Sequence, residues 1–253
     1  MNTPTLQWHE RLYHRDELRA GRYAALADAE GFHTICFALE ALGLRLNGRK
    51  AALGAYKTAM SSLAQSSVVL SKLAEIHPER FSRFNSLFDF VKSARNDAMH
   101  TGVYARHATA AAIELCIGLE EALMKEQQIP RQTVQDFMVK TPVTLKPWQP
   151  VAHARQLMLT HSFSFLPVFI GTWKLLSETG LARYMRSDKD WAGLLSQLIE
   201  HAAPNLNLID AKVVCLEDEV AKLIQEDDNE TRLWLVVDNH KRLCGVLSPF
   251  ELI

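Results

Sequence analysis

An internal repeat in the C-terminal half is the feature that most restricts how this chain can fold. Each copy has a short apolar run, a helical stretch and two further β-rich runs. The matching segments are Thr141–Leu145, Val151–Met158, Leu166–Val168 and Leu175–Ser177 in the first copy, and Lys212–Leu216, Val220–Ile224, Leu235–Asp238 and Gly245–Ser248 in the second. The offset is 69 residues for the middle segments and 71 for the last, which places a two-residue insertion around 239–241. A constant offset over four elements predicts two copies of one β-α-β unit.

Over residues 134–253 this half resembles a tandem pair of CBS domains, with repeats at about 134–187 and 207–253. The closing run Arg242-Leu243-Cys244-Gly245-Val246-Leu247-Ser248-Pro249-Phe250-Glu251-Leu252-Ile253 is close to that family's last strand and helix start. The first copy is more divergent, with Gly171-Thr172-Trp173-Lys174-Leu175-Leu176-Ser177 at this place. The resemblance implies β-α-β-β-α units packed as a pair, which commonly bind adenosine-type ligands between them. The sequence ends at Ile253, before a full last helix of the second copy.

The same resemblance names candidate nucleotide-binding residues. Ser248 and Glu251 match the family's [ST]-x-x-[DE] element, in which the hydroxyl meets a phosphate and the carboxylate accepts hydrogen bonds from the ribose. Ser177 holds the equivalent place in the first copy, but Gly180 follows it where the acid is expected. We therefore expect at most one competent site, for a regulatory adenine nucleotide such as AMP, ATP or S-adenosylmethionine. The alternative is that Ser248 and Glu251 form a helix capping box, which has the same spacing.

The N-terminal half, residues 1–130, is predicted to be helical. Apolar residues recur at steps of three and four over 32–46, 53–70, 84–91 and 103–124, with a break at Asn47-Gly48. This pattern predicts an antiparallel four-helix bundle. Residues 1–20 are polar and mixed in charge, and an additional helix there is left open. The fold class is therefore α+β, with a helical bundle over 1–130 followed by the repeat pair over 131–253.

One segment of the bundle, Arg95-Asn96-Asp97-Ala98-Met99-His100, carries groups suited to phosphodiester chemistry. Five residues of continuous helix would set Arg95 and His100 about 140° apart. A helix end between them removes this objection, and Asn96 or Asp97 would then cap the next helix. With 16 Arg and 10 His in the chain, chance alone predicts about two such Arg–His spacings, and Arg155…His161 is the other.

This segment stands at the junction of the third and fourth predicted helices. With it in that place, the chain over about residues 20–127 resembles the HEPN domain family. Its ribonuclease members use an R-x(4–6)-H motif whose first x is polar, which Arg95, Asn96 and His100 satisfy. The resemblance implies a homodimer that gathers two Arg/His sets in one cleft and a toxin or antiphage role. An imidazole transfers protons near neutral pH, and an arginine stabilises charge on phosphoryl oxygens, so RNA can be cut without a metal or other cofactor. The alternatives are that Arg95 pairs with Asp89 or Asp97, and that the chain is a non-catalytic dimeric nucleotide sensor.

A basic stretch adds a candidate RNA-binding surface. No acidic residue lies between Glu40 and Glu75, whereas that stretch contains Arg45, Arg49, Lys50, Lys57 and Lys72. These cations would follow an RNA backbone, although an exposed charged face without function is the commoner reading. No aromatic residues are interleaved with them, so base stacking is not indicated.

Composition restricts the remaining classes. The chain has 253 residues and a formal charge of −1, which excludes a tail-driven polyanion binder. It contains no apolar run of membrane-spanning length, and its first residues lack the order of a secretory signal. Cys36, Cys116, Cys215 and Cys244 are too dispersed to form a zinc site, so we expect buried, reduced thiols in a cytoplasmic protein.

Overall fold

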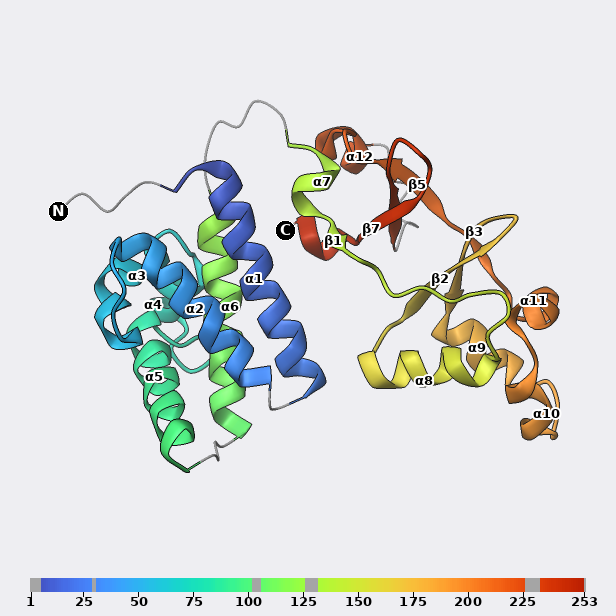
Figure 1. The fold of residues 1–253 in the computed structure, drawn as a ribbon, viewed down its shortest axis with the longest axis horizontal. Helices are drawn as coiled ribbons and strands as arrows, with labels where there is room; N and C mark the ends of the chain where they lie inside the picture. Colours follow the sequence, from blue (N-terminus) through green and yellow to red (C-terminus); the bar gives the residue numbers. More distant parts are fainter. Residues whose placement is uncertain (1–5, 29–30, 102–105, 126–131, 226–232, 253) are drawn as a thin grey trace. The chain divides into compact units, whose positions relative to one another are not determined.

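The structure is a computed structural model that describes residues 6–28, 31–101, 106–125, 132–225 and 233–252. The chain divides into two compact units, residues 1–128 and 129–253 (Figure 1). The first unit is helical and the second contains both sheets, so the α+β class is confirmed. No helix within the described ranges combines the length and the apolar character needed to cross a bilayer.

The first unit is built from long helices joined by shorter helical segments. Its elements are α1 (Trp8–Ala27), α2 (Phe32–Asn47), η2 (Leu53–Tyr56), α3 (Lys57–Ala64), η3 (Val69–Leu73), α4 (Ala74–Ile76), α5 (Phe84–Thr101) and α6 (Arg106–Met124). Most of the N-terminal segment 1–20, for which the sequence left a further helix open, lies in α1. This helix packs against both α2 and α6 (Figure 1). Arg22 of α1 donates two hydrogen bonds, of 2.9 and 3.1 Å, to the Glu120 carboxylate of α6. The bundle therefore contains a long N-terminal helix in addition to the four predicted segments.

Helix α2 forms where the apolar spacing predicts it. Ile35, Leu39 and Leu42 on its inner face are completely buried. The helix ends at Gly48, whose φ of 72° lies in the left-handed region that glycine enters without strain.

The second predicted helix, over 53–70, is wrong as one continuous element. The chain leaves α3 after Ala64 and enters a π-helical turn at Val69. The Glu121 carboxylate of α6 accepts hydrogen bonds from the Ser67 hydroxyl and from the backbone N–H groups of Val68 and Val69. These contacts satisfy donors that a regular helix would pair internally, so the interruption is stabilised by a distant residue.

The second unit contains both repeats. Its elements are α7 (Val134–Phe137), β1 (Val139–Lys140), α8 (Val151–His161), β2 (Phe165–Ile170), β3 (Thr172–Ser177), α9 (Glu178–Tyr184), α10 (Trp191–Ser196), α11 (Ile199–Ala202), η4 (Ala203–Asn205), β4 (Ile209–Asp210), β5 (Lys212–Cys215), α12 (Val220–Gln225), β6 (Trp234–Val237), β7 (Leu243–Leu247) and η5 (Pro249–Leu252). One sheet has the order β1-β7-β6-β5 and the other β2-β3-β4. Only a short 3₁₀ turn follows β7 within the described residues.

The two repeats exchange edge strands. β1 lies at the start of the first copy but pairs antiparallel with β7 of the second, with Val139 opposite Val246. β4 lies at the start of the second copy but pairs antiparallel with β3 of the first, with Ile209 opposite Leu175. Because each copy supplies an edge strand to the other's sheet, the two copies form one folding unit. The predicted helix and the two strands after it are present in both copies, whereas the first predicted strand of the first copy, Thr141–Leu145, is reduced to an isolated bridge between Leu145 and Val168.

The predicted burial of the four thiols is correct for two of them. Cys36 and Cys116 are buried, whereas Cys244 is partly exposed and Cys215 is exposed. Cys215 ends β5, the last strand of its sheet, so one side of it lacks a neighbouring strand. None of the four is in a disulfide.

Candidate functional site

Helix α5 carries all three predicted catalytic residues. It runs without interruption from Phe84 to Thr101, so Arg95, Asn96 and His100 lie in one helix. The expected helix end between Arg95 and His100 is therefore wrong. The segment between them has no glycine or proline to stop the helix. The backbone consequently sets positions 95 and 100 about 140° apart around the helix axis. The His100 side chain lies outside the described residues.

The Arg95 guanidinium lies at the end of a buried row on α5. Phe84, Phe88 and Val91, which precede it on this face, are all at least 95% buried, whereas the Arg95 side chain is 27% exposed. Its Nη2 donates a 2.5 Å hydrogen bond to Oε1 of Glu40 on α2. Of the two alternative partners, Asp89 is paired with Lys57 instead. An arginine at the edge of a core needs such a partner to offset its desolvation.

Cys36 of α2 lies within the electrostatic influence of this ion pair. Burial raises the pKa of the Cys36 thiol to about 12, although the Arg95 charge acts in the opposite direction. Cys36 is therefore protonated at neutral pH and is not a nucleophile of this site.

A second face of α5 is polar. Asp89 accepts a 2.6 Å hydrogen bond from Lys57 of α3 and lies 3.6 Å from Lys92 of α5. The Lys57 ammonium is the main cause of a lowered pKa at Asp89. Asn96 is exposed one turn beyond Lys92, and position 100 follows one turn later. The helix register therefore groups position 100 with Lys92 and Asn96 rather than with Arg95.

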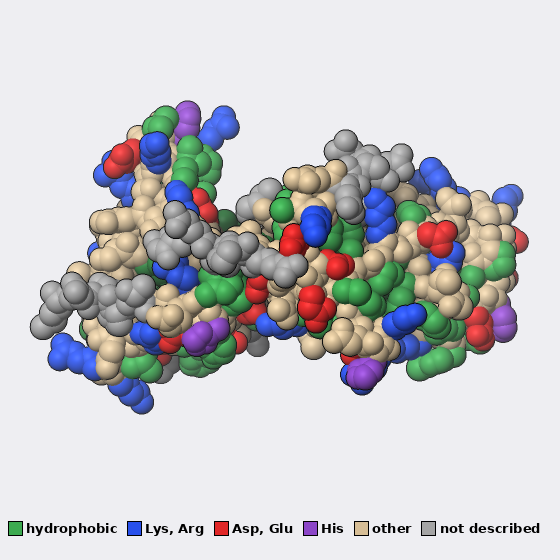
Figure 2. Space-filling model, turned by 90° about the horizontal axis from the view of Figure 1, so that it is seen from above, with side chains coloured by type: hydrophobic (Ala, Val, Ile, Leu, Met, Phe, Trp, Pro, Cys, Tyr) green, Lys and Arg blue, Asp and Glu red, His purple; other side chains and the backbone are tan. Residues whose placement is uncertain are grey.

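The predicted RNA-binding cations have different environments. Arg49 and Lys50 are exposed in the segment between α2 and η2. Arg45 instead forms a two-pronged ion pair with Glu10 of α1, at 2.6 and 2.7 Å, and Lys57 is paired with Asp89. On the face shown in Figure 2, blue Lys and Arg side chains of the helical unit form separate groups interspersed with acidic ones. Partners distant in sequence thus offset part of the charge of the acid-free stretch.

The Arg45–Glu10 pair makes a testable prediction. The Arg45 hydrogen bond is the main reason that the pKa of Glu10 falls to about 2 from an ordinary 4.5. The contribution to stability is present above pH 4.5 and is lost as pH falls through 2. In Arg45→Gln we expect NMR titration of the Glu10 carboxyl to show a pKa that moves back toward 4.5. A Glu10 pKa that stays near 2 in Arg45→Gln would contradict this assignment.

In the second unit, Ser248 and Glu251 contact each other. Glu251 Oε2 accepts a 2.8 Å hydrogen bond from the Ser248 backbone N–H and another from the Ser248 hydroxyl. This is the carboxylate half of a capping box at the start of η5. The two side chains are therefore brought together at the end of β7, with their hydrogen-bonding groups directed at each other.

Ser177 has a different arrangement at the matching place in the first copy. Its hydroxyl accepts a 3.0 Å hydrogen bond from the Gly180 backbone N–H and so caps α9. Ser177 is 94% buried. The first copy thus uses its serine for helix capping and has no carboxylate three residues later.

Comparison with known proteins yields similarities over about half of this chain. No protein-family model and no curated protein sequence matches it. A CBS domain-containing protein of unknown function from Bacillus anthracis is 19% identical with a TM-score of 0.40, and covers 50% of this chain and 91% of its own. A CBS-domain protein from Agrobacterium tumefaciens is 17% identical with a TM-score of 0.39, and covers 50% and 95%. The CBS domain of a bacterial CNNM/CorC-family Mg²⁺ transporter, solved with ATP, is 15% identical with a TM-score of 0.40, and covers 48% and 84%.

The sequence interpretation missed Glu40 as the partner of Arg95. The two residues are 55 positions apart, so no local spacing joins them. The available signal was weak: Glu40 is the last acidic residue before the acid-free stretch and lies in a helix predicted to pack in the same bundle.

Proposed function

We propose that the helical unit is a metal-independent endoribonuclease that cleaves unpaired RNA. The observation that carries this proposal is the Arg95 guanidinium, which leaves the end of a buried row and reaches the surface beside Glu40. A guanidinium has five N–H donors, and the structure records one hydrogen bond from Arg95 to another described residue. Further donors can therefore contact a phosphate while Glu40 holds the side chain in position.

The proposed reaction uses the substrate's own nucleophile. The 2′-oxygen attacks the adjacent phosphorus, the bond from phosphorus to the 5′-oxygen breaks, and a 2′,3′-cyclic phosphate remains. An imidazole accepts the proton from the 2′-hydroxyl and, once protonated, donates a proton to the departing 5′-oxygen. Arg95 stabilises the charge that develops on the phosphoryl oxygens. Atoms and protons balance without a metal ion.

The unbroken helix argues for a composite site between two protomers. Arg95 and His100 leave α5 about 140° apart, so one copy does not direct both at one phosphate. A homodimer in which Arg95 of one copy faces His100 of the other removes this conflict and gathers both Arg/His sets in one cleft. The HEPN resemblance implies such a dimer, and a toxin or antiphage effector is the role that it implies for the enzyme.

Substitution of His100 tests the proposed activity. Purified protein is expected to cut single-stranded RNA in EDTA and to leave cyclic-phosphate ends. His100→Ala should reduce the rate at least about a hundredfold, since general acid–base catalysis contributes this much. The matched control is His161→Ala, because Arg155 and His161 have a similar spacing in the second unit. Equal activity in His100→Ala, or equal losses in both variants, would contradict the assignment.

The competing function is a non-catalytic dimeric sensor or interaction protein. The Arg95–Glu40 ion pair favours it, because a guanidinium paired across α2 and α5 also has a purely structural use. The ribonuclease assay separates the two: the sensor predicts no cleavage by the wild-type protein.

We further propose that the CBS-type pair binds one regulatory adenine nucleotide, through the second copy. Ser248 and Glu251 lie together at the end of β7, and a nucleotide would exchange their mutual hydrogen bonds for contacts to phosphate and ribose. The first copy lacks the carboxylate, so a single site is expected. Without a nucleotide, the same module would serve to stabilise the dimer.

Thermal melting tests this second proposal. AMP, ATP or S-adenosylmethionine at about a hundred times its dissociation constant should stabilise the fold by about 2.7 kcal/mol. Glu251→Gln should abolish the shift, because the amide replaces the anionic acceptor of the ribose hydroxyls, while Ser177→Ala should retain it. An absence of any shift, or a shift unchanged in Glu251→Gln, would contradict nucleotide binding at this position.

A further inference from the structure

The outer face of α2 carries exposed apolar side chains. Phe37 is 69% exposed and Leu44 is 41% exposed, and the seven residues between them span about two helical turns. At about 100° per residue, both lie on the opposite side of the helix from the buried Ile35 and Leu42. The middle of a solvent-facing side is normally polar in a helix that packs on one face only. We call Phe37 and Leu44, with the half-buried Ala41 between them, the α2 stripe.

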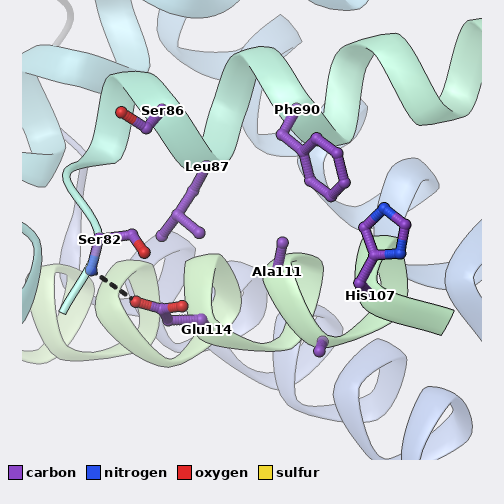
Figure 3. A pocket seen from close by; sticks show the side chains of 8 residues that line it. Ser82, Ser86, Leu87, Phe90, His107, Ala111 and Glu114 are labelled. Atoms are coloured by element: carbon purple, nitrogen blue, oxygen red, sulfur yellow. Dashed lines mark hydrogen bonds between the residues drawn. The ribbon is translucent and has the colours of Figure 1, made fainter. Parts of the chain in front are cut away.

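Phe90 of α5 shows how an exposed phenylalanine of this unit is covered within its own chain. Its ring stacks on the His107 ring of α6, with centroids 5.1 Å apart (Figure 3). Phe90 is 37% exposed, whereas Phe37 is 69% exposed. Phe37 is therefore the side chain with more apolar surface left for a contact with another molecule.

The α2 stripe is complementary to a second copy of itself in antiparallel orientation. The midpoint between Phe37 and Leu44 falls between positions 40 and 41. In a two-fold pair centred there, Phe37 of each copy lies opposite Leu44 of the other, because both are equally far from the axis. The small side chain of Ala41 at the centre lets the two helices approach closely.

The charges at the ends of α2 favour the same orientation. Arg49 and Lys50 are exposed just after the helix, and Asp28 is exposed shortly before it. Antiparallel pairing brings the basic end of one helix toward the acidic end of the other and opposes the two helix dipoles. A parallel pair would instead place like charges side by side.

Antiparallel pairing also gathers the proposed catalytic arginines. Glu40, which holds Arg95, lies about 50° around α2 from the centre of the stripe, on the side that faces α5. The two-fold axis of an antiparallel pair runs across both helices, so it keeps both Glu40–Arg95 pairs on one edge of the interface. The axis of a parallel pair runs along the helices and would send them to opposite edges.

We infer that α2 docks antiparallel on α2 of a second copy of this chain, with Phe37 against Leu44 at the centre of the interface. This inference names the surface of the homodimer, and it rests on the proposed composite ribonuclease site. Both arginines then border one cleft, as that site requires.

Two charged variants and their mixture test the register by sedimentation velocity. Phe37→Glu and Leu44→Lys each set a charge against an apolar side chain at both contacts, so each alone should weaken the dimer at least about tenfold. An equimolar mixture should recover the dimer. At one contact the new carboxylate meets the new ammonium, and at the other the retained leucine meets the retained phenylalanine.

Phe90→Glu is the matched control, because it makes the same change at an exposed phenylalanine outside the α2 stripe. It should leave the dimer intact, and circular dichroism checks that all variants fold. A monomeric wild-type protein would overturn the inference, as would a dimer that persists in both Phe37→Glu and Leu44→Lys. A mixture no more dimeric than its parts, or an equal loss in Phe90→Glu, would also overturn it.

RNA cleavage by the same proteins separates this inference from the ribonuclease proposal. Cleavage that is lost in each charged variant and recovers in the mixture supports both. If the dimer behaves as expected but the wild-type protein cuts no RNA, the ribonuclease proposal alone fails. If the wild-type protein cuts RNA and both charged variants cut it equally well, the α2 surface alone fails.

Discussion

The ion pair between Arg95 and Glu40 is the interaction on which the account of the helical unit depends. It joins α5 to α2 at the point where the buried row of α5 reaches the surface. The carboxylate offsets the desolvation of the guanidinium and fixes its direction. A lysine at this position would lack the planar fork that lets one group contact a carboxylate and a phosphate together. Glu40 is thus a positioning residue in the proposed site.

The second unit is held together in another way. Reciprocal pairing of β1 with β7, and of β4 with β3, makes each repeat complete the sheet of the other. Ser248 and Glu251 stand at the end of β7, next to this exchange. A ligand that separates these two side chains would act close to the strand that links the copies. This proximity gives the proposed nucleotide a physical route to the stability of the whole pair.

Local patterns predicted much of this fold. Apolar spacing identified α2, α5 and α6, and the offset of the repeat identified the helix and the two following strands of each copy. The predictions that were wrong failed for two reasons. Some depend on contacts with residues distant in the sequence, and the helix end between Arg95 and His100 was expected from the chemistry of the motif. Glu121 interrupts the second predicted helix from 53 residues away, and Glu10 and Asp89 pair with Arg45 and Lys57 across the bundle. The continuity of α5 could have been read from the sequence, which has no glycine or proline between Arg95 and His100.

The candidate site was predicted less completely than the fold. Residue types located Arg95, and spacing placed Ser248 beside Glu251, but the Glu40 contact arises only when α2 and α5 pack together. Side chains from separate helices leave no common spacing in the sequence. Tertiary packing therefore supplied the partner of the arginine.

A double-mutant cycle on RNA cleavage tests most directly whether Glu40 acts through Arg95. The rates of the wild type, Glu40→Gln, Arg95→Gln and the double variant would be compared in EDTA, with folding checked by circular dichroism. If Glu40 positions Arg95 for the phosphate, each single variant is slower and the double variant is no slower than Arg95→Gln alone. Additive losses in the double variant, or cleavage unaffected by Arg95→Gln, would contradict the account.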